Sequence, residues 1–172
     1  MDAILKPISP AGVPAALAKA EKYRLLNEPG EAESICRDVL AIEPDNQMAL
    51  RLLGLTLTDQ FNGTGLDHYA EASRVFDSLR DAYERLYYSG ILHERRAKAQ
   101  LRGGCFPHTL LVLFEEAMQC FEQAEKLRPS GNDDAILRWN RCVRILQSRT
   151  SSEWAKEFDP IETSDSPPDW RP

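Results

Sequence analysis

The stretch "EEAMQCFEQAEKLRPSGNDDA", residues 115–135, places small residues, one aromatic residue and a proline at fixed intervals. These positions are Ala117, Phe121, Ala124 and Pro129, at offsets of four, three and five. A second stretch, "GEAESICRDVLAIEPDNQMAL", residues 30–50, repeats the same offsets. Its corresponding residues are Ala32, Cys36, Val39 and Pro44. The recurrence predicts that the chain contains an internal repeat.

Most of the chain around these stretches has apolar residues spaced by three and four, which predicts helices and no strands. A first helix is expected over residues 14–26 and ends at the turn "NEPG", residues 27–30. A second helix is expected from this turn to residue 43, and further helices over 47–61, 110–127 and 132–147. The segment 69–101 contains no proline and one glycine, and a single helix of that length would span ~50 Å. Because a domain of this size cannot cover such a helix, we expect a break near Asp81.

The last predicted helix has an apolar stripe that we expect to be buried. Its members are Ala135, Trp139, Cys142, Val143 and Leu146. Asn132 or Asp133 is the expected N-cap of this helix, since both side chains accept hydrogen bonds from free backbone N–H groups.

A complementary pattern lies between the two repeated stretches. "LRLLGLTL", residues 50–57, supplies Leu50, Leu53, Gly54 and Leu57, and the chain continues with Tyr69, Ala72 and Phe76. Together these patterns resemble the tetratricopeptide repeat, which combines W-x2-L-G-x2-Y on a first helix with A-x3-F on a second helix ending in proline. The resemblance covers about residues 14–147. It implies an all-α fold of antiparallel helical hairpins stacked as a short right-handed α-solenoid.

The spacing of the repeats departs from the family period of ~34 residues. Ala32 to Ala72 is 40 residues, and Ala72 to Ala117 is 45. The extra residues are expected in the turn "NGTGLDH" and in the loop "RGGCFPHT". The third repeat is therefore the irregular one.

Composition excludes several classes of protein. The net charge of −6 and the pI near 5.2 argue against a nucleic-acid surface, and no apolar run is long enough to cross a bilayer. Four cysteines stand singly without a CxxC pair, which is typical of reduced thiols in a cytoplasmic protein. We expect a flexible leader at 1–13, a repeat domain at 14–149, and an acidic tail rich in proline and serine at 150–172 that is disordered or loosely docked.

The resemblance implies a protein–protein interaction module that holds a peptide or a partner helix on the concave face of the array. The candidate partner-binding residues are Arg51, Tyr87, Glu94, Arg95 and Asn140. We expect them to form a polar and aromatic groove for an acidic or carboxamide-bearing segment. The structural alternative is an ion pair that joins Arg95 to Asp133 or Asp134. The alternative function is a structural or self-associating helical protein, with a homodimer as its form.

No catalytic centre, cofactor or metal site is predicted. Cys105 and His108 have a C-x2-H spacing, but two ligands do not complete a tetrahedral zinc site. The sequence has no nucleophile with a base and an orienting group beside it, and no phosphate-binding glycine loop.

Overall fold

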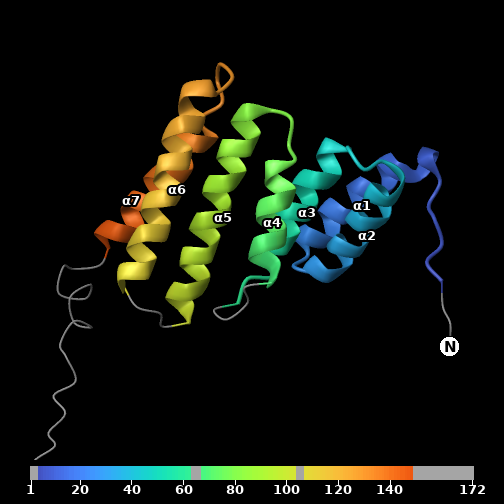
Figure 1. Cartoon of the computed structure of the whole chain (residues 1–172), viewed down its shortest axis with the longest axis horizontal. Helices are drawn as coiled ribbons and strands as arrows, with labels where there is room; N and C mark the ends of the chain where they lie inside the picture. The colour runs from blue at the N-terminus through green and yellow to red at the C-terminus, as the bar shows by residue number, and fades with distance from the viewer. Residues whose placement is uncertain (1–3, 63–66, 104–106, 149–172) are drawn as a thin grey trace, which may run out of the picture.

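The computed structural model describes residues 4–62, 67–103 and 107–148, and every regular element in these ranges is helical. After a 3-10 turn at Pro10–Gly12, the helices are α1 Val13–Leu25, α2 Pro29–Ile42, α3 Gln47–Asp59, α4 Asp67–Asp77, α5 Ala82–Arg102, α6 Pro107–Leu127 and α7 Asp134–Gln147. Consecutive helices pack against each other as adjacent antiparallel pairs (Figure 1). The all-α prediction is therefore confirmed for the described residues.

Side-chain caps explain where the helices begin. The Asn46 side chain accepts a hydrogen bond from the backbone N–H of Ala49 at 2.9 Å, at the start of α3. The Asp81 side chain accepts one from the backbone N–H of Glu84 at 2.8 Å, at the start of α5. Each cap satisfies a backbone donor that has no partner inside the helix. Since α4 ends at Asp77 and Asp81 caps α5, the break predicted near Asp81 is confirmed.

Two glycines allow unusually close packing between paired helices. A Cβ atom added to Gly54 on α3 would lie 2.2 Å from Cε1 of Phe76 on α4. A Cβ atom added to Gly90 on α5 would lie 2.5 Å from Cε1 of Phe121 on α6. Both phenylalanines are fully buried. Each phenylalanine ring thus packs directly on the backbone of a glycine in the preceding helix. This close packing explains why the glycine and phenylalanine positions recur in two successive helix pairs.

The core is continuous through the stack. One cluster of buried side chains is built mainly from α1 to α4, and a second from α5 to α7. Leu55 and Tyr88 pack against both clusters. In the first helix pair the repeat position of the phenylalanine is taken by Cys36, which is fully buried like Ala20 of α1. Cys36 is smaller than phenylalanine, and α1 correspondingly carries Ala20 where α3 and α5 carry a glycine.

Several predicted details are wrong. The helix expected over 47–61 ends at Asp59, and the helix expected from 110 begins at Pro107. On α7, Trp139 of the predicted buried stripe is 37% exposed, whereas Ile145, which is not part of that stripe, is 8% exposed. The cause is that α7 has two neighbouring apolar stripes, and the one that contains Ala135, Cys142 and Ile145 is the buried one.

Most of the predicted leader belongs to the described residues, and the predicted tail does not. Within the predicted leader, Ile8 packs against the core and Val13 is buried as the first residue of α1. The predicted tail, 150–172, lies outside the described residues. In the described ranges, none of the helices combines the length and the apolar character that crossing a bilayer requires.

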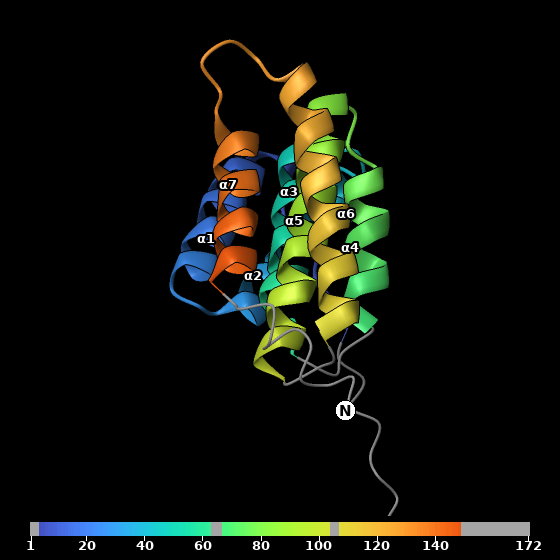
Figure 2. The ribbon, with the colours of Figure 1, turned by 90° about the vertical axis from the view of Figure 1, so that its left-hand side faces the viewer.

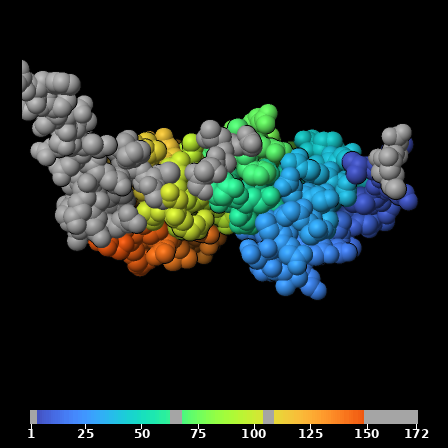
Figure 3. Space-filling view, turned by 90° about the horizontal axis from the view of Figure 1, so that it is seen from below, coloured from blue at the N-terminus to red at the C-terminus, as the bar shows by residue number. Residues whose placement is uncertain are grey.

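Alternate helices form one face of the molecule. α1 contacts α3, α3 contacts α5, and α5 contacts α7. Seen end-on, α4 and α6 lie on one side of the stack, α3 and α5 in the middle, and α1 and α7 on the other side (Figure 2). From below, the surface is hollowed between α7 and the α1–α2 pair (Figure 3). We call this hollowed side, lined by α1, α3, α5 and α7, the inner face.

Candidate functional site: a basic groove on the inner face

Two adjoining cavities open on the inner face. The first has a volume of about 290 Å³ and is lined by Thr58, Asp59, Arg95, Lys98, Arg102 and Arg138, from α3, α5 and α7. The second has a volume of about 440 Å³ and is lined by Lys98, Leu101, Arg102, Arg141, Arg144, Ile145 and Ser148, from α5, α7 and the residue that follows α7. Lys98 and Arg102 border both cavities, so we treat them as one recess and call it the basic groove.

Positive charge is concentrated in this groove although the chain as a whole has a net charge of −6. Among the described residues that line it, six side chains are basic and Asp59 is the one acidic side chain. Arg102, Arg141 and Arg144 are exposed, and none of them forms an ion pair within the ranges that the structure describes. These guanidinium groups are therefore free to bind an anionic ligand.

Asp59 connects three helices at the floor of the groove. Its Oδ2 atom lies 2.5 Å from Nε of Arg24 on α1, and its Oδ1 atom pairs with Nη1 of Arg95 on α5. The same Nη1 group of Arg95 donates to Oγ1 of Thr58 at 2.7 Å and to the carbonyl oxygen of Leu55 at 3.1 Å. Burial lowers the pKa of Arg95, and the charge of Asp59 opposes this shift. Arg95 thus ties α5 to α3.

A buried carboxylate lies under the groove. Glu94 is fully buried, pairs with Lys98, and has Oε2 at 3.4 Å from Nη1 of Arg138. Burial lowers the pKa of Arg138, but the Glu94 charge and a hydrogen bond with Tyr87 outweigh it, and the net pKa shift is upward. Glu94 therefore fixes two basic side chains, on α5 and on α7, at the wall of the groove. It does not itself reach the surface.

Tyr87 belongs to a chain of aromatic contacts inside the stack. Its ring stacks on Tyr83 with centroids 5.7 Å apart, meets Tyr88 edge-on at 5.2 Å, and lies 6.0 Å from Phe121. Tyr88 in turn stacks on Phe76 of α4 at 5.2 Å. These rings join α4, α5 and α6, and Tyr87 is half-buried among them.

The other two predicted binding residues lie outside the groove. Arg51 Nη1 on α3 is 2.8 Å from Oε1 of Glu84 at the start of α5. Asn140 on α7 is half-buried. Neither residue lines either cavity.

Of the five predicted binding residues, the structure thus brings Arg95 into the groove wall and Glu94 beneath it. The alternative ion pair of Arg95 with Asp133 or Asp134 is wrong in its partner, because the carboxylate that faces Arg95 is Asp59. Asp133 instead pairs with Arg128.

Most of the basic groove was not predicted from the sequence. The groove residues without a sequence prediction are Lys98, Arg102, Arg138 and Arg141. A signal for them exists, since Arg95, Lys98 and Arg102 are three and four residues apart, a spacing that puts them on one side of a helix. Nothing local indicates that the basic residues of α7 lie beside them.

No group of three or more His, Cys, Asp or Glu side chains is placed to hold a metal ion in the part of the chain that the structure describes. Cys105 and the His108 side chain lie outside it. Burial raises the pKa of Cys36 to about 11 and that of Cys142 to about 12, so both thiols stay protonated near neutral pH and are poor nucleophiles.

Comparison of the chain with protein-family models, with curated proteins and with solved structures found no match.

Proposed function

We propose that this chain is a protein–protein interaction module that binds an acidic peptide segment in the basic groove. The proposal includes the arrangement implied by the repeat pattern, a short right-handed α-solenoid of tetratricopeptide type. The Gly54–Phe76 and Gly90–Phe121 packing supports this arrangement, as do the contacts among the alternate helices α1, α3, α5 and α7. In such an array the alternate helices line the concave surface that takes a ligand.

The observation that carries the proposal is the concentration of basic side chains in the groove of an acidic chain. Guanidinium groups bind carboxylates through two parallel hydrogen bonds, which gives geometric specificity as well as attraction. Because Glu94 holds Arg138 and Lys98 in place, less side-chain freedom is lost when a ligand binds. A peptide with several carboxylates matches this surface.

The proposal can be tested by charge reversal at the two exposed arginines of α7. We expect Arg141→Glu/Arg144→Glu to weaken the binding of a fluorescein-labelled peptide of alternating glutamate and glycine at least tenfold, about 1.4 kcal/mol or more. Fluorescence anisotropy measures the affinity. The fold should be retained, because both side chains are exposed and make no ion pair in the described ranges.

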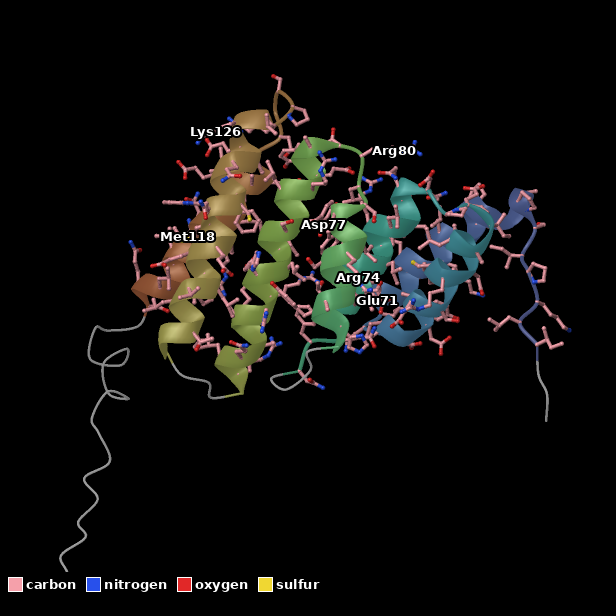
Figure 4. All side chains as sticks on the ribbon, viewed as in Figure 1. Glu71, Arg74, Asp77, Arg80, Met118 and Lys126 are labelled. Atoms are coloured by element: carbon pink, nitrogen blue, oxygen red, sulfur yellow. The ribbon has the colours of Figure 1, made fainter. Side chains whose placement is uncertain are left out.

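A matched control lies on the opposite face. Arg74 on α4 and Lys126 on α6 are exposed on the side turned toward the viewer in Figure 4. Arg74→Glu/Lys126→Glu changes the net charge by the same amount and should leave the affinity unchanged. If both double variants lost the same affinity for the peptide, the net charge of the chain would explain the effect, and the proposal would be contradicted.

The same titration addresses the other classes of partner. Tighter binding of a single-stranded oligonucleotide of equal length than of the peptide would contradict a protein ligand. No binding of the peptide, together with a tight homodimer in light scattering, would favour the alternative of a structural, self-associating protein.

A further inference from the structure

The second cavity of the basic groove differs from the first in its balance of charge. In the wall of the first cavity, Asp59 pairs with Arg95. The second cavity has a volume of about 440 Å³, and no side chain is acidic among the described residues that line it. Four of these lining side chains are basic, namely Lys98, Arg102, Arg141 and Arg144. The wall of the second cavity therefore does not neutralise its own positive charge.

The arrangement of α5 and α7 brings the four basic side chains to the same level. Consecutive helices are antiparallel, so α5 and α7 run in the same direction (Figure 1). The contact between Glu94 on α5 and Arg138 on α7 sets the register of the two helices. Lys98 and Arg102 follow Glu94 by about one and two turns, and the two arginines from α7 follow Arg138 by similar distances. The two pairs of basic residues thus border the same stretch of the groove.

Most of this charge has no partner in the described part of the chain. Lys98 pairs with the buried carboxylate of Glu94. Arg102, Arg141 and Arg144 are exposed and form no ion pair within the described ranges. Even when the charge of Glu94 is counted fully against Lys98, three positive charges remain. A ligand carboxylate supplies one negative charge, whereas a phosphate monoester supplies about 1.5 to 2 near neutral pH, with three strong acceptor oxygens.

We propose that the second cavity is a site for a phosphorylated serine or threonine within the acidic segment. This inference rests on the proposed function and names the group that the groove recognises. The guanidinium groups of α5 and α7 are able to donate pairs of parallel hydrogen bonds to phosphate oxygens, and Lys98 adds a compact positive charge. A dianion also relieves the repulsion among the three arginines more than a monoanion does. Phosphorylation of the partner therefore strengthens the complex, and dephosphorylation weakens it.

A phosphorylated protein segment fits the position of the site better than the headgroup of a lipid does. The groove opens on the inner face, which is hollowed between α7 and the α1–α2 pair (Figure 3). A flat bilayer would meet the helices that border this hollow first, whereas a peptide can follow the groove. The first cavity continues the groove and offers Arg138 to a carboxylate beside the phosphorylated residue.

The test compares two ligands of nearly equal charge. Both are fluorescein-labelled peptides of alternating glutamate and glycine. One has phosphoserine followed by serine at its centre, and the other has two glutamates there, so that each central pair carries about two negative charges near neutral pH. We expect the phosphopeptide to bind at least about fivefold tighter in fluorescence anisotropy, because its charge and acceptor oxygens are gathered in one group.

Neutral substitutions in the second cavity locate this preference. Arg102→Gln/Arg144→Gln should bring the ratio of the two affinities to about one. The fold should be retained, because both side chains are exposed and lack an ion pair in the described ranges, and circular dichroism checks this. Arg74→Gln/Lys126→Gln on the opposite face is the matched control and should leave the ratio unchanged.

The outcomes separate this inference from the proposed function. If both peptides bound with equal affinity, the phosphate site would be wrong and the proposed function would stand. An unchanged preference in the Arg102→Gln/Arg144→Gln chain would also overturn the site, because phosphate would then bind elsewhere. If neither peptide bound, the proposed function would fail and this inference with it. Tighter binding to vesicles of phosphatidylcholine and phosphatidylinositol phosphate than to the phosphopeptide would overturn it too, because a membrane would then be the partner.

Discussion

Asp59 connects residues that are far apart in the sequence. Its two oxygens engage Arg24 on α1 and Arg95 on α5, 35 and 36 residues away. A sequence pattern shows which residues share a helix face, but it does not show which acid on another helix meets a given base. This explains why Arg95 could be placed on the inner face from the sequence while its partner could not be named. It also changes the expected role of Arg95 from ligand contact to scaffold.

Replacing Arg95 with alanine tests that role. The Arg95 side chain is 20% exposed, and Nη1 has three acceptors, so Arg95→Ala leaves Asp59 and Thr58 with fewer partners. We expect a loss of about 1.5–3 kcal/mol in the free energy of unfolding, the usual range for hydrogen bonds to charged groups. Urea denaturation measures it.

Arg144→Ala is the comparison for this prediction. Arg144 is exposed and lacks an ion pair in the described ranges, so its replacement should change stability by no more than about 0.5 kcal/mol. If the two alanine variants were equally stable, Arg95 would not be a scaffold residue.

At the level of helices, the repeat spacing predicted which helices pair, because the repeated positions are those where two helices pack closely. Gly54 and Phe76 were both marked by the pattern, and the structure places them in contact. The pairing of Gly90 with Phe121 follows the same rule across an irregular third repeat. The register of α7 was not predictable in the same way. Its two apolar stripes are equally regular, and the buried one is the stripe that places Arg138 next to the buried Glu94 of α5.

Adding one methyl group at Gly90 tests the packing rule. A Cβ at this position would lie within 2.5 Å of the Phe121 ring, which is itself fully buried and has no room to move freely. We expect Gly90→Ala to lower the free energy of unfolding by about 1–3 kcal/mol through overpacking, even though alanine favours helix.

Gly30 on α2 provides the control for that substitution. A Cβ there would meet no atom within 4 Å, so Gly30→Ala should be neutral or stabilising by up to about 1 kcal/mol. Chemical denaturation of both variants gives the difference. A Gly90→Ala chain as stable as the Gly30→Ala chain would contradict close packing between α5 and α6.

Across the whole molecule, charge is segregated. The basic groove gathers six positive side chains on the inner face, whereas the chain as a whole is acidic. The net negative charge of the sequence argues against an anionic partner. The surface that could bind such a partner becomes visible when the structure places α5 beside α7. Because the groove is open to solvent, its attraction for an acidic peptide should weaken as ionic strength rises.

The most direct measurement is a footprint of the peptide on the isotope-labelled chain by backbone amide chemical shifts. During titration with the glutamate–glycine peptide, we predict the largest shifts around Lys98 and Arg102 on α5 and around Arg141 and Arg144 on α7. The amides of α4, on the other face, should not move. Shifts confined to α2, α4 or α6, or no shifts at a large excess of peptide, would contradict the account of the groove as the binding site.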